Sequence, residues 1–131
     1  MKTAIRESIT VTTGIETPYE KAFAYISNPR NQPAWAVNFV KEVKGTDDEL
    51  VMVTPIGDLP FEFRTDPALG SVDIVFKGGG AIPTRVVPNG KGSEFIFTLF
   101  RPDGTPDDAW ARQLEGLKEE LSILKTTLES N

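Results

Sequence analysis

The side chains that could do chemistry in this sequence are carboxylates, tyrosines, lysines and arginines. The 131 residues include no cysteine and no histidine. Disulfides and thiolate nucleophiles are therefore excluded, and so is the most common general base and metal ligand. Proton transfer would depend on Asp, Glu, Tyr or Lys, and a metal site built from carboxylates alone would be unusual. We expect no metal and no cofactor, and the residue types leave any catalytic residue unassigned.

Arg85 is the most suggestive single residue, because a guanidinium can clamp a carboxylate or polarise a carbonyl. It precedes Asn89-Gly90, the strongest hairpin signal in the chain. With these two residues as the loop, Arg85 lies opposite Glu94 in an exposed cross-strand pair. Arg64 and Asp73 lie opposite each other if their own hairpin is symmetric. The pattern leaves open whether these charges face a cavity or solvent, and it favours solvent.

Net charge and hydropathy exclude two classes of partner. The formal net charge is −5, which disfavours binding to nucleic-acid phosphates and to anionic membranes. No apolar run approaches the roughly 20 residues that span a bilayer, and residues 1–7 have no apolar core of a secretory signal. We therefore predict a cytoplasmic protein that neither binds nucleic acid nor inserts into a membrane.

Helical patterns flank a middle region of strands and turns. Alternating apolar residues predict strands over 4–15, 37–44, 50–54, 60–66, 71–77, 81–87 and 93–101. After the first strand, Thr17-Pro18-Tyr19-Glu20 is typical of a helix start with Thr17 as N-cap, and a short helix over 29–34 follows, capped by Asn28. Thr105 is the predicted N-cap of a final helix of about six turns that starts at Pro106. No repeat or linker interrupts the pattern, so we expect residues 1–131 to form one domain.

The final helix carries one apolar stripe: Trp110, Leu114, Leu117, Leu121, Leu124 and Leu128. This spacing has two interpretations. It could be a coiled-coil seam, but it lasts under three heptads and Gly116 interrupts it. We favour packing against the sheet of the same domain, because the amphipathic strands must bury their inner face.

The inner face of the predicted sheet is rich in phenylalanine and can be either a filled core or the lining of an apolar cavity. The polar candidate on this face is Thr84, and Tyr25 could direct its hydroxyl to the cavity mouth. The predicted ligand-binding residues are Tyr25, Trp35, Phe39, Phe61, Phe63, Ile74, Phe76, Thr84, Phe95, Phe97, Trp110, Leu114 and Leu117. The run Gly78-Gly79-Gly80 is not a phosphate-binding loop, and we interpret it as a hairpin tip or, alternatively, a cavity lid.

Nearly the whole chain resembles the START-like, or SRPBCC, superfamily, the polyketide cyclase/dehydrase and lipid-transport group. Residues 15–29 look like that family's opening, a capped helix that ends in a short polar turn, and Trp35 falls where the family has a tryptophan before its second strand. Residues 83–101 and 124–129 look like a bacterial branch with no assigned function. The resemblance implies an α+β helix-grip fold. In it, a curved antiparallel sheet of six to seven strands wraps around the long C-terminal helix, and two short helices follow the first strand.

Three functions are compatible with this fold, which hosts unrelated activities. The first is a carrier or sensor that binds a small, largely apolar molecule, for which we expect a closed apolar cavity without buried acids. The second is a cyclase- or dehydratase-like enzyme acting on a polyketide-like or other carbonyl substrate, which should show a buried carboxylate, Tyr or Lys converging on the cavity. The third is a protein-interaction module, which should show a filled core and a large exposed apolar patch. Its partner could be a second copy of the chain, giving a homodimer.

Overall fold

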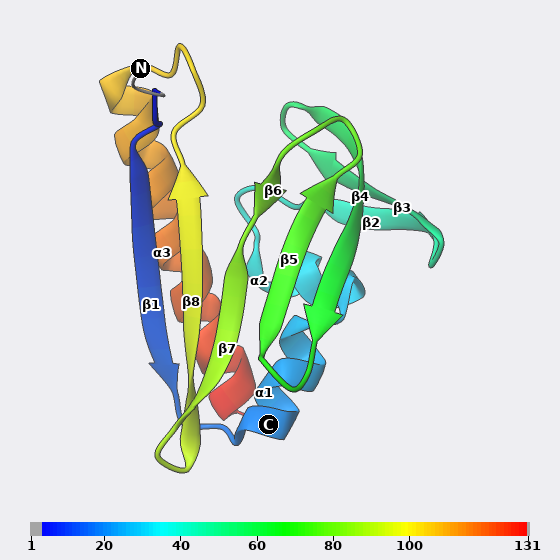
Figure 1. The fold of residues 1–131 in the computed structure, drawn as a ribbon, viewed down its shortest axis with the longest axis vertical. Helices are drawn as coiled ribbons and strands as arrows, with labels where there is room; N and C mark the ends of the chain where they lie inside the picture. Colours follow the sequence, from blue (N-terminus) through cyan, green and yellow to red (C-terminus); the bar gives the residue numbers. More distant parts are fainter. Residues whose placement is uncertain (1–3, 131) are drawn as a thin grey trace.

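The computed structural model describes residues 4–130 and has one curved antiparallel sheet grasping a long helix (Figure 1). The strands follow the order β1-β8-β7-β5-β4-β3-β2, and β6 pairs with β5. The strands are β1 (Ser8–Ile15), β2 (Glu42–Thr46), β3 (Glu49–Thr54), β4 (Gly57–Asp66), β5 (Ser71–Phe76), β6 (Ala81–Ile82), β7 (Thr84–Asn89) and β8 (Gly92–Phe100). The predicted α+β helix-grip fold is confirmed, with eight strands in the sheet of the described residues where six to seven were expected.

Several strand predictions differ from the structure: the strand predicted over 4–15 begins at Ser8, and the one predicted over 60–66 begins at Gly57. The strand predicted over 81–87 is divided into β6 and β7 at Pro83, whose ring nitrogen cannot donate to the sheet. The strand predicted over 37–44 begins only at Glu42, because residues 36–40 form a tight turn. In this turn the amides of Phe39 and Val40 both donate to the carbonyl of Ala36, at 3.1 and 2.8 Å.

Two short helices follow β1, as predicted, although the N-cap of the first one differs. Helix α1 (Tyr19–Ile26) begins after Pro18, and Thr17 is not its N-cap. The Thr17 hydroxyl instead donates to the carbonyl of Leu128, 3.0 Å away. Asn28 does cap the next segment, accepting from the amide of Arg30 at 3.0 Å. That segment is a 3₁₀ turn, η1 (Pro29–Asn31), which continues into α2 (Gln32–Trp35).

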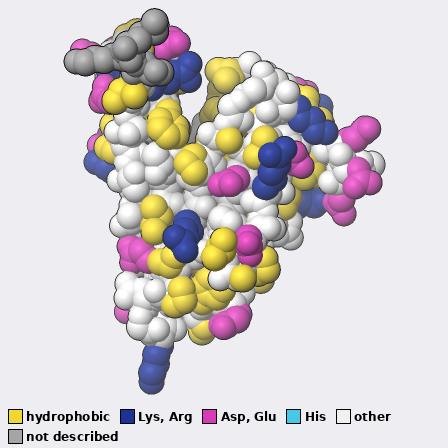
Figure 2. Space-filling view, in the orientation of Figure 1, with side chains coloured by type: hydrophobic (Ala, Val, Ile, Leu, Met, Phe, Trp, Pro, Cys, Tyr) yellow, Lys and Arg dark blue, Asp and Glu magenta, His cyan; other side chains and the backbone are white. Residues whose placement is uncertain are grey.

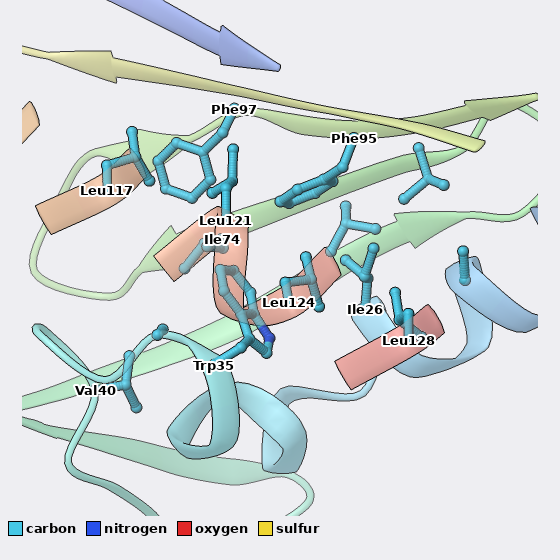
Figure 3. Packing of buried hydrophobic residues seen from close by; sticks show 14 of the residues in the cluster. Ile26, Trp35, Val40, Ile74, Phe95, Phe97, Leu117, Leu121, Leu124 and Leu128 are labelled. Atoms are coloured by element: carbon cyan, nitrogen blue, oxygen red, sulfur yellow. The ribbon is translucent and has the colours of Figure 1, made fainter. Parts of the chain in front are cut away.

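The long helix α3 (Asp107–Glu129) places its apolar stripe inside its own domain. Pro106, not Thr105, is its N-cap residue, and the carbonyl of Thr105 accepts from Arg101 instead. Five stripe residues are buried, whereas Leu114 is half-buried. Figure 3 shows the leucines of α3 packed between the sheet phenylalanines and Trp35. The stripe is therefore part of the domain core.

The hairpin between β7 and β8 is displaced by two residues from the predicted register. Its loop is Gly90 and Lys91, so Asn89 faces Gly92 and Arg85 faces Ile96. The predicted pairing of Arg85 with Glu94 is therefore wrong. Gly90 is the first residue of the two-residue loop, whereas it was expected to be the second. A shift of two residues leaves each side chain on its original face, so the predicted inner residues remain inward.

The charged residues of the two hairpins lie on the outer face. Arg85 is exposed and its Nε donates to the carbonyl of Leu69 at 2.9 Å. Arg64 does lie opposite Asp73, as predicted, but its guanidinium binds Glu62 of its own strand at 3.0 Å. These side chains therefore face away from the groove described below.

The sheet narrows at one joint, which divides it into two limbs. The first limb contains β1 and β8, the second contains β2 to β6, and β7 joins them (Figure 1). Between β5 and β7 the only paired residues in the described chain are Ser71 and Arg85, next to a 2.8 Å bond from the amide of Val86 to the carbonyl of Gly70. Beyond this joint the two limbs diverge, leaving one side of α3 open.

Candidate functional site

A groove of about 1470 Å³ lies between the two limbs, along the N-terminal half of α3. Figure 2 shows the molecule hollowed between the limbs. Strands β3 to β6 supply one wall and β8 the other, while α2, the 36–40 turn and α3 complete it. The groove is open to solvent and differs in this respect from the closed cavity expected of a carrier.

Six of the predicted site residues line this groove: Trp35, Phe39, Ile74, Phe76, Phe97 and Leu117. They come from five different parts of the fold and meet because the sheet curves over α3. Their apolar surfaces give the groove a lining suited to a hydrocarbon or aromatic ligand.

The other seven predicted residues lie outside the lining. Phe61 and Phe95 are each 1% exposed and belong to the filled core, where the ring of Phe95 packs edge-on against Trp35 at 5.9 Å. The hydroxyl of Thr84 donates to the carbonyl of Val72. The remaining four are Tyr25, Phe63, Trp110 and Leu114. The inner face is thus core near the joint and groove beyond it, a division that alternation along a strand does not reveal.

Several lining residues were not among those predicted. Met52 and Leu59 come from β3 and β4, and Ile82 and Leu99 extend the alternation of β6 and β8. Ile82 lies two positions before Thr84 and Leu99 two positions after Phe97, so strand alternation alone places both on the inner face. The run 78–80 also lines the groove, with Gly79 and Gly80 at positive φ, and its role as a lid stays a prediction.

Glu120 is a buried acid in the lining of this groove, whereas a carrier was expected to have no buried acid and an enzyme was expected to have one. Among the acidic residues that the structure describes it alone is buried, at 7% exposed. Its Oε2 accepts hydrogen bonds from the amides of Asn38 and Phe39, at 2.8 and 3.2 Å, and so fastens the 36–40 turn to α3. Its Oε1 has no hydrogen-bond partner within residues 4–130 and is not sealed off by neighbouring atoms. One carboxylate oxygen is therefore structural and the other is free.

Burial controls the acidity of Glu120. Loss of solvent raises the pKa of its carboxyl group above the ordinary value, and the two backbone hydrogen bonds oppose this in part. Glu119 also raises the pKa by its negative charge, whereas Lys41 lowers it. The sequence did contain a signal for this residue: Glu120 lies three positions after Leu117 and four before Leu124, on the apolar side of the helix.

Two further polar atoms in this region lack partners. The indole nitrogen of Trp35 and the Oε1 of Gln32 are buried without a hydrogen bond from any residue in the described part of the chain. The other tryptophan differs, because Trp110 donates to Oε2 of Glu7 at 3.1 Å. Trp35 therefore stabilises this wall through its ring and not through its nitrogen.

The described residues offer neither a metal site nor a membrane-spanning helix. Within residues 4–130 no group of three or more carboxylates is placed to hold a metal ion. Over that range, too, the helices are too short or too polar to cross a bilayer.

Comparison with known proteins identifies the fold. No family model and no curated protein sequence matches the chain. A START superfamily protein from Mycobacterium smegmatis has a similar structure, with a TM-score of 0.71 at 12% identity over 94% of this chain and 97% of that one. The protein XoxI from Bacillus cereus gives 0.71 at 13% identity, covering 92% and 94%. Aha1 from Colwellia psychrerythraea, solved as a dimer, gives 0.70 at 17% identity, covering 94% and 96%. The resemblance read from the sequence is thus confirmed for the fold, which is START-like.

Proposed function

We propose that the groove binds a small, largely apolar molecule and that the protein acts as its carrier or sensor. The observation that carries this proposal is a space of about 1470 Å³ with walls built largely from apolar side chains of the sheet and helices. Ligand sites are typically concave and apolar with few polar groups. Such a space inside a domain of this size leaves apolar surface unburied, which a ligand would cover.

Binding of the neutral dye Nile red tests this proposal. We expect its fluorescence to rise on addition of the protein and an Ile82→Asp variant to weaken its affinity at least about tenfold, because a carboxylate would enter an apolar wall. The matched control is Ile96→Asp, since Ile96 is half-buried on the opposite face of the sheet. Absence of dye binding, or equal loss in both variants, would contradict a ligand site in the groove.

Glu120 supports a second candidate function, a cyclase- or dehydratase-like enzyme. A buried carboxylate with a raised pKa and a free oxygen at a groove could transfer a proton. Native mass spectrometry of the purified protein, followed by denaturing extraction, separates the two candidates. A carrier should release the same molecule from wild type and from Glu120→Gln, whereas a dehydratase variant should retain a precursor heavier by one water.

Assembly and compartment are separate questions. Association into a homodimer through the outer sheet face or α3 stays a prediction, and sedimentation at several protein concentrations would test it. The cytoplasmic location likewise stays a prediction.

A further inference from the structure

The charged residues that line the groove are of two kinds: Glu120, which is buried, and five exposed residues. The exposed residues, Arg6, Arg112, Glu115, Lys118 and Glu119, lie at the rim. All five are already engaged: Arg6 binds Asp103, Arg112 binds Asp108, Lys118 binds Glu115, and Glu119 accepts from the side-chain amide of Asn38. Glu120 is different, because it is buried and one of its oxygens is unused.

The geometry around Glu120 defines what that oxygen can recognise. The amides of Asn38 and Phe39 both donate to Oε2 and so fix the orientation of the carboxylate. Oε1 cannot reach these two donors while Oε2 holds them. An ionised carboxylate only accepts hydrogen bonds. A ligand that displaces solvent from Oε1 must therefore supply a donor or leave this oxygen unpaired, which is unfavourable. A ligand with a donor at this position would gain a hydrogen bond. A ligand with only an acceptor there would be repelled.

We propose that the molecule bound by this groove is an apolar compound bearing a hydrogen-bond donor, a hydroxyl or an amine, which donates to Oε1 of Glu120. The inference rests on the proposed function, and it adds the ligand's polar group and its orientation. The apolar part would lie along Phe97, Ile82 and Leu117, and the donor would lie against the α3 wall beside Asn38.

Two isomeric probes isolate the donor. Decan-1-ol and 1-methoxynonane have the same formula, but only the alcohol can donate a hydrogen bond. Each would displace Nile red from the protein at alkaline pH, because burial raises the pKa of Glu120 and a high pH favours its ionised form. We expect wild type to bind decan-1-ol at least about tenfold more tightly, the effect of one hydrogen bond to a charged group.

The variant Glu120→Gln provides the decisive comparison. Its amide oxygen can keep the bonds to Asn38 and Phe39 while its NH₂ group replaces Oε1, so the preference for the alcohol should fall to within about twofold. Glu129→Gln is the matched control: Glu129 lies on the same helix and accepts from the amide of Glu16 at 2.8 Å, but it is outside the groove lining. This control should keep the tenfold preference, and circular dichroism would verify folding of both variants.

The outcomes separate this inference from the proposed function. Equal binding of the two isomers by wild type, or an unchanged preference in Glu120→Gln, would overturn the role of Glu120 while leaving an apolar ligand site intact. Failure of Nile red to bind at all would overturn both.

Discussion

At the scale of the residue, Glu120 shows how a charged group can be kept inside a small domain. Removing a carboxylate from water is costly unless hydrogen bonds replace its solvent. Here two backbone donors come from consecutive residues of the 36–40 turn. Since only Oε2 has hydrogen-bond donors, the lost solvent is only partly replaced. Desolvation therefore raises the pKa of Glu120 by more than the hydrogen bonds lower it.

The stability of the protein should report this balance. Because the pKa of Glu120 is raised on folding, the folded state binds a proton more tightly than the unfolded state. The contribution of Glu120 to the free energy of unfolding is therefore greatest below the ordinary glutamate pKa. It is lost as the pH rises through the pKa of Glu120 in the folded state. Relative to Glu120→Gln, wild type should become progressively less stable over that interval.

Urea unfolding of both proteins across this pH range measures the effect. Glu119 and Lys41, the charged groups that shift this pKa, act on the Glu120 carboxyl group of the wild type alone, so their effects are part of the difference that is measured. If wild type instead gained stability over Glu120→Gln with rising pH, the two backbone hydrogen bonds would outweigh burial.

At the scale of the element, the joint between the limbs depends on a glycine. Gly70 has φ of +79°, and a Cβ there would overlap the carbonyl oxygen of Val86 on β7. The backbone therefore passes closer to β7 than any side chain would permit, and this contact accompanies the Val86–Gly70 hydrogen bond.

A pair of alanine substitutions tests this joint. Gly90→Ala places a Cβ in open space at φ of +58°. It should lower the free energy of unfolding by about 1 kcal/mol, the strain of a left-handed backbone at alanine. Gly70→Ala carries the same penalty and also separates β5 from β7, so we expect at least about 1 kcal/mol more destabilisation. Chemical denaturation of the two variants gives the difference. Similar values for both would mean that the joint tolerates displacement and does not hold the limbs together.

The elements themselves were largely predictable from the sequence, because they follow local patterns. Asn28 caps the turn that was assigned to it, and the α3 stripe lies in the core as its spacing indicated. One of the errors arose where a tertiary contact overrides local preference. Thr17 has the chemistry of an N-cap, yet its hydroxyl is used by the C-terminal end of α3, and no local pattern contains that information.

At the scale of the whole molecule, the groove could be predicted in kind but only partly in residues. Alternation places Phe95 and Phe97 on the same face, yet the first packs in the core and the second lines the groove. Which one faces the open space depends on where the limbs diverge, and that is set by a pairing between residues distant in sequence. Glu120 was missed for a related reason, because the donors that accompany its burial lie about 80 positions earlier in the chain.

Because both limbs and both flanking helices contribute to the groove, a ligand there should stabilise the molecule as one unit. Binding to the folded state alone adds about 2.7 kcal/mol at a concentration 100 times the dissociation constant. For a chain of this length that raises the midpoint of thermal unfolding by on the order of 10 °C. Differential scanning calorimetry with increasing decan-1-ol should therefore show a single transition that moves upward. The Ile82→Asp variant should show a much smaller shift. A midpoint that stayed constant while decan-1-ol displaced Nile red would place the binding site in a part of the protein that unfolds independently of the sheet and α3.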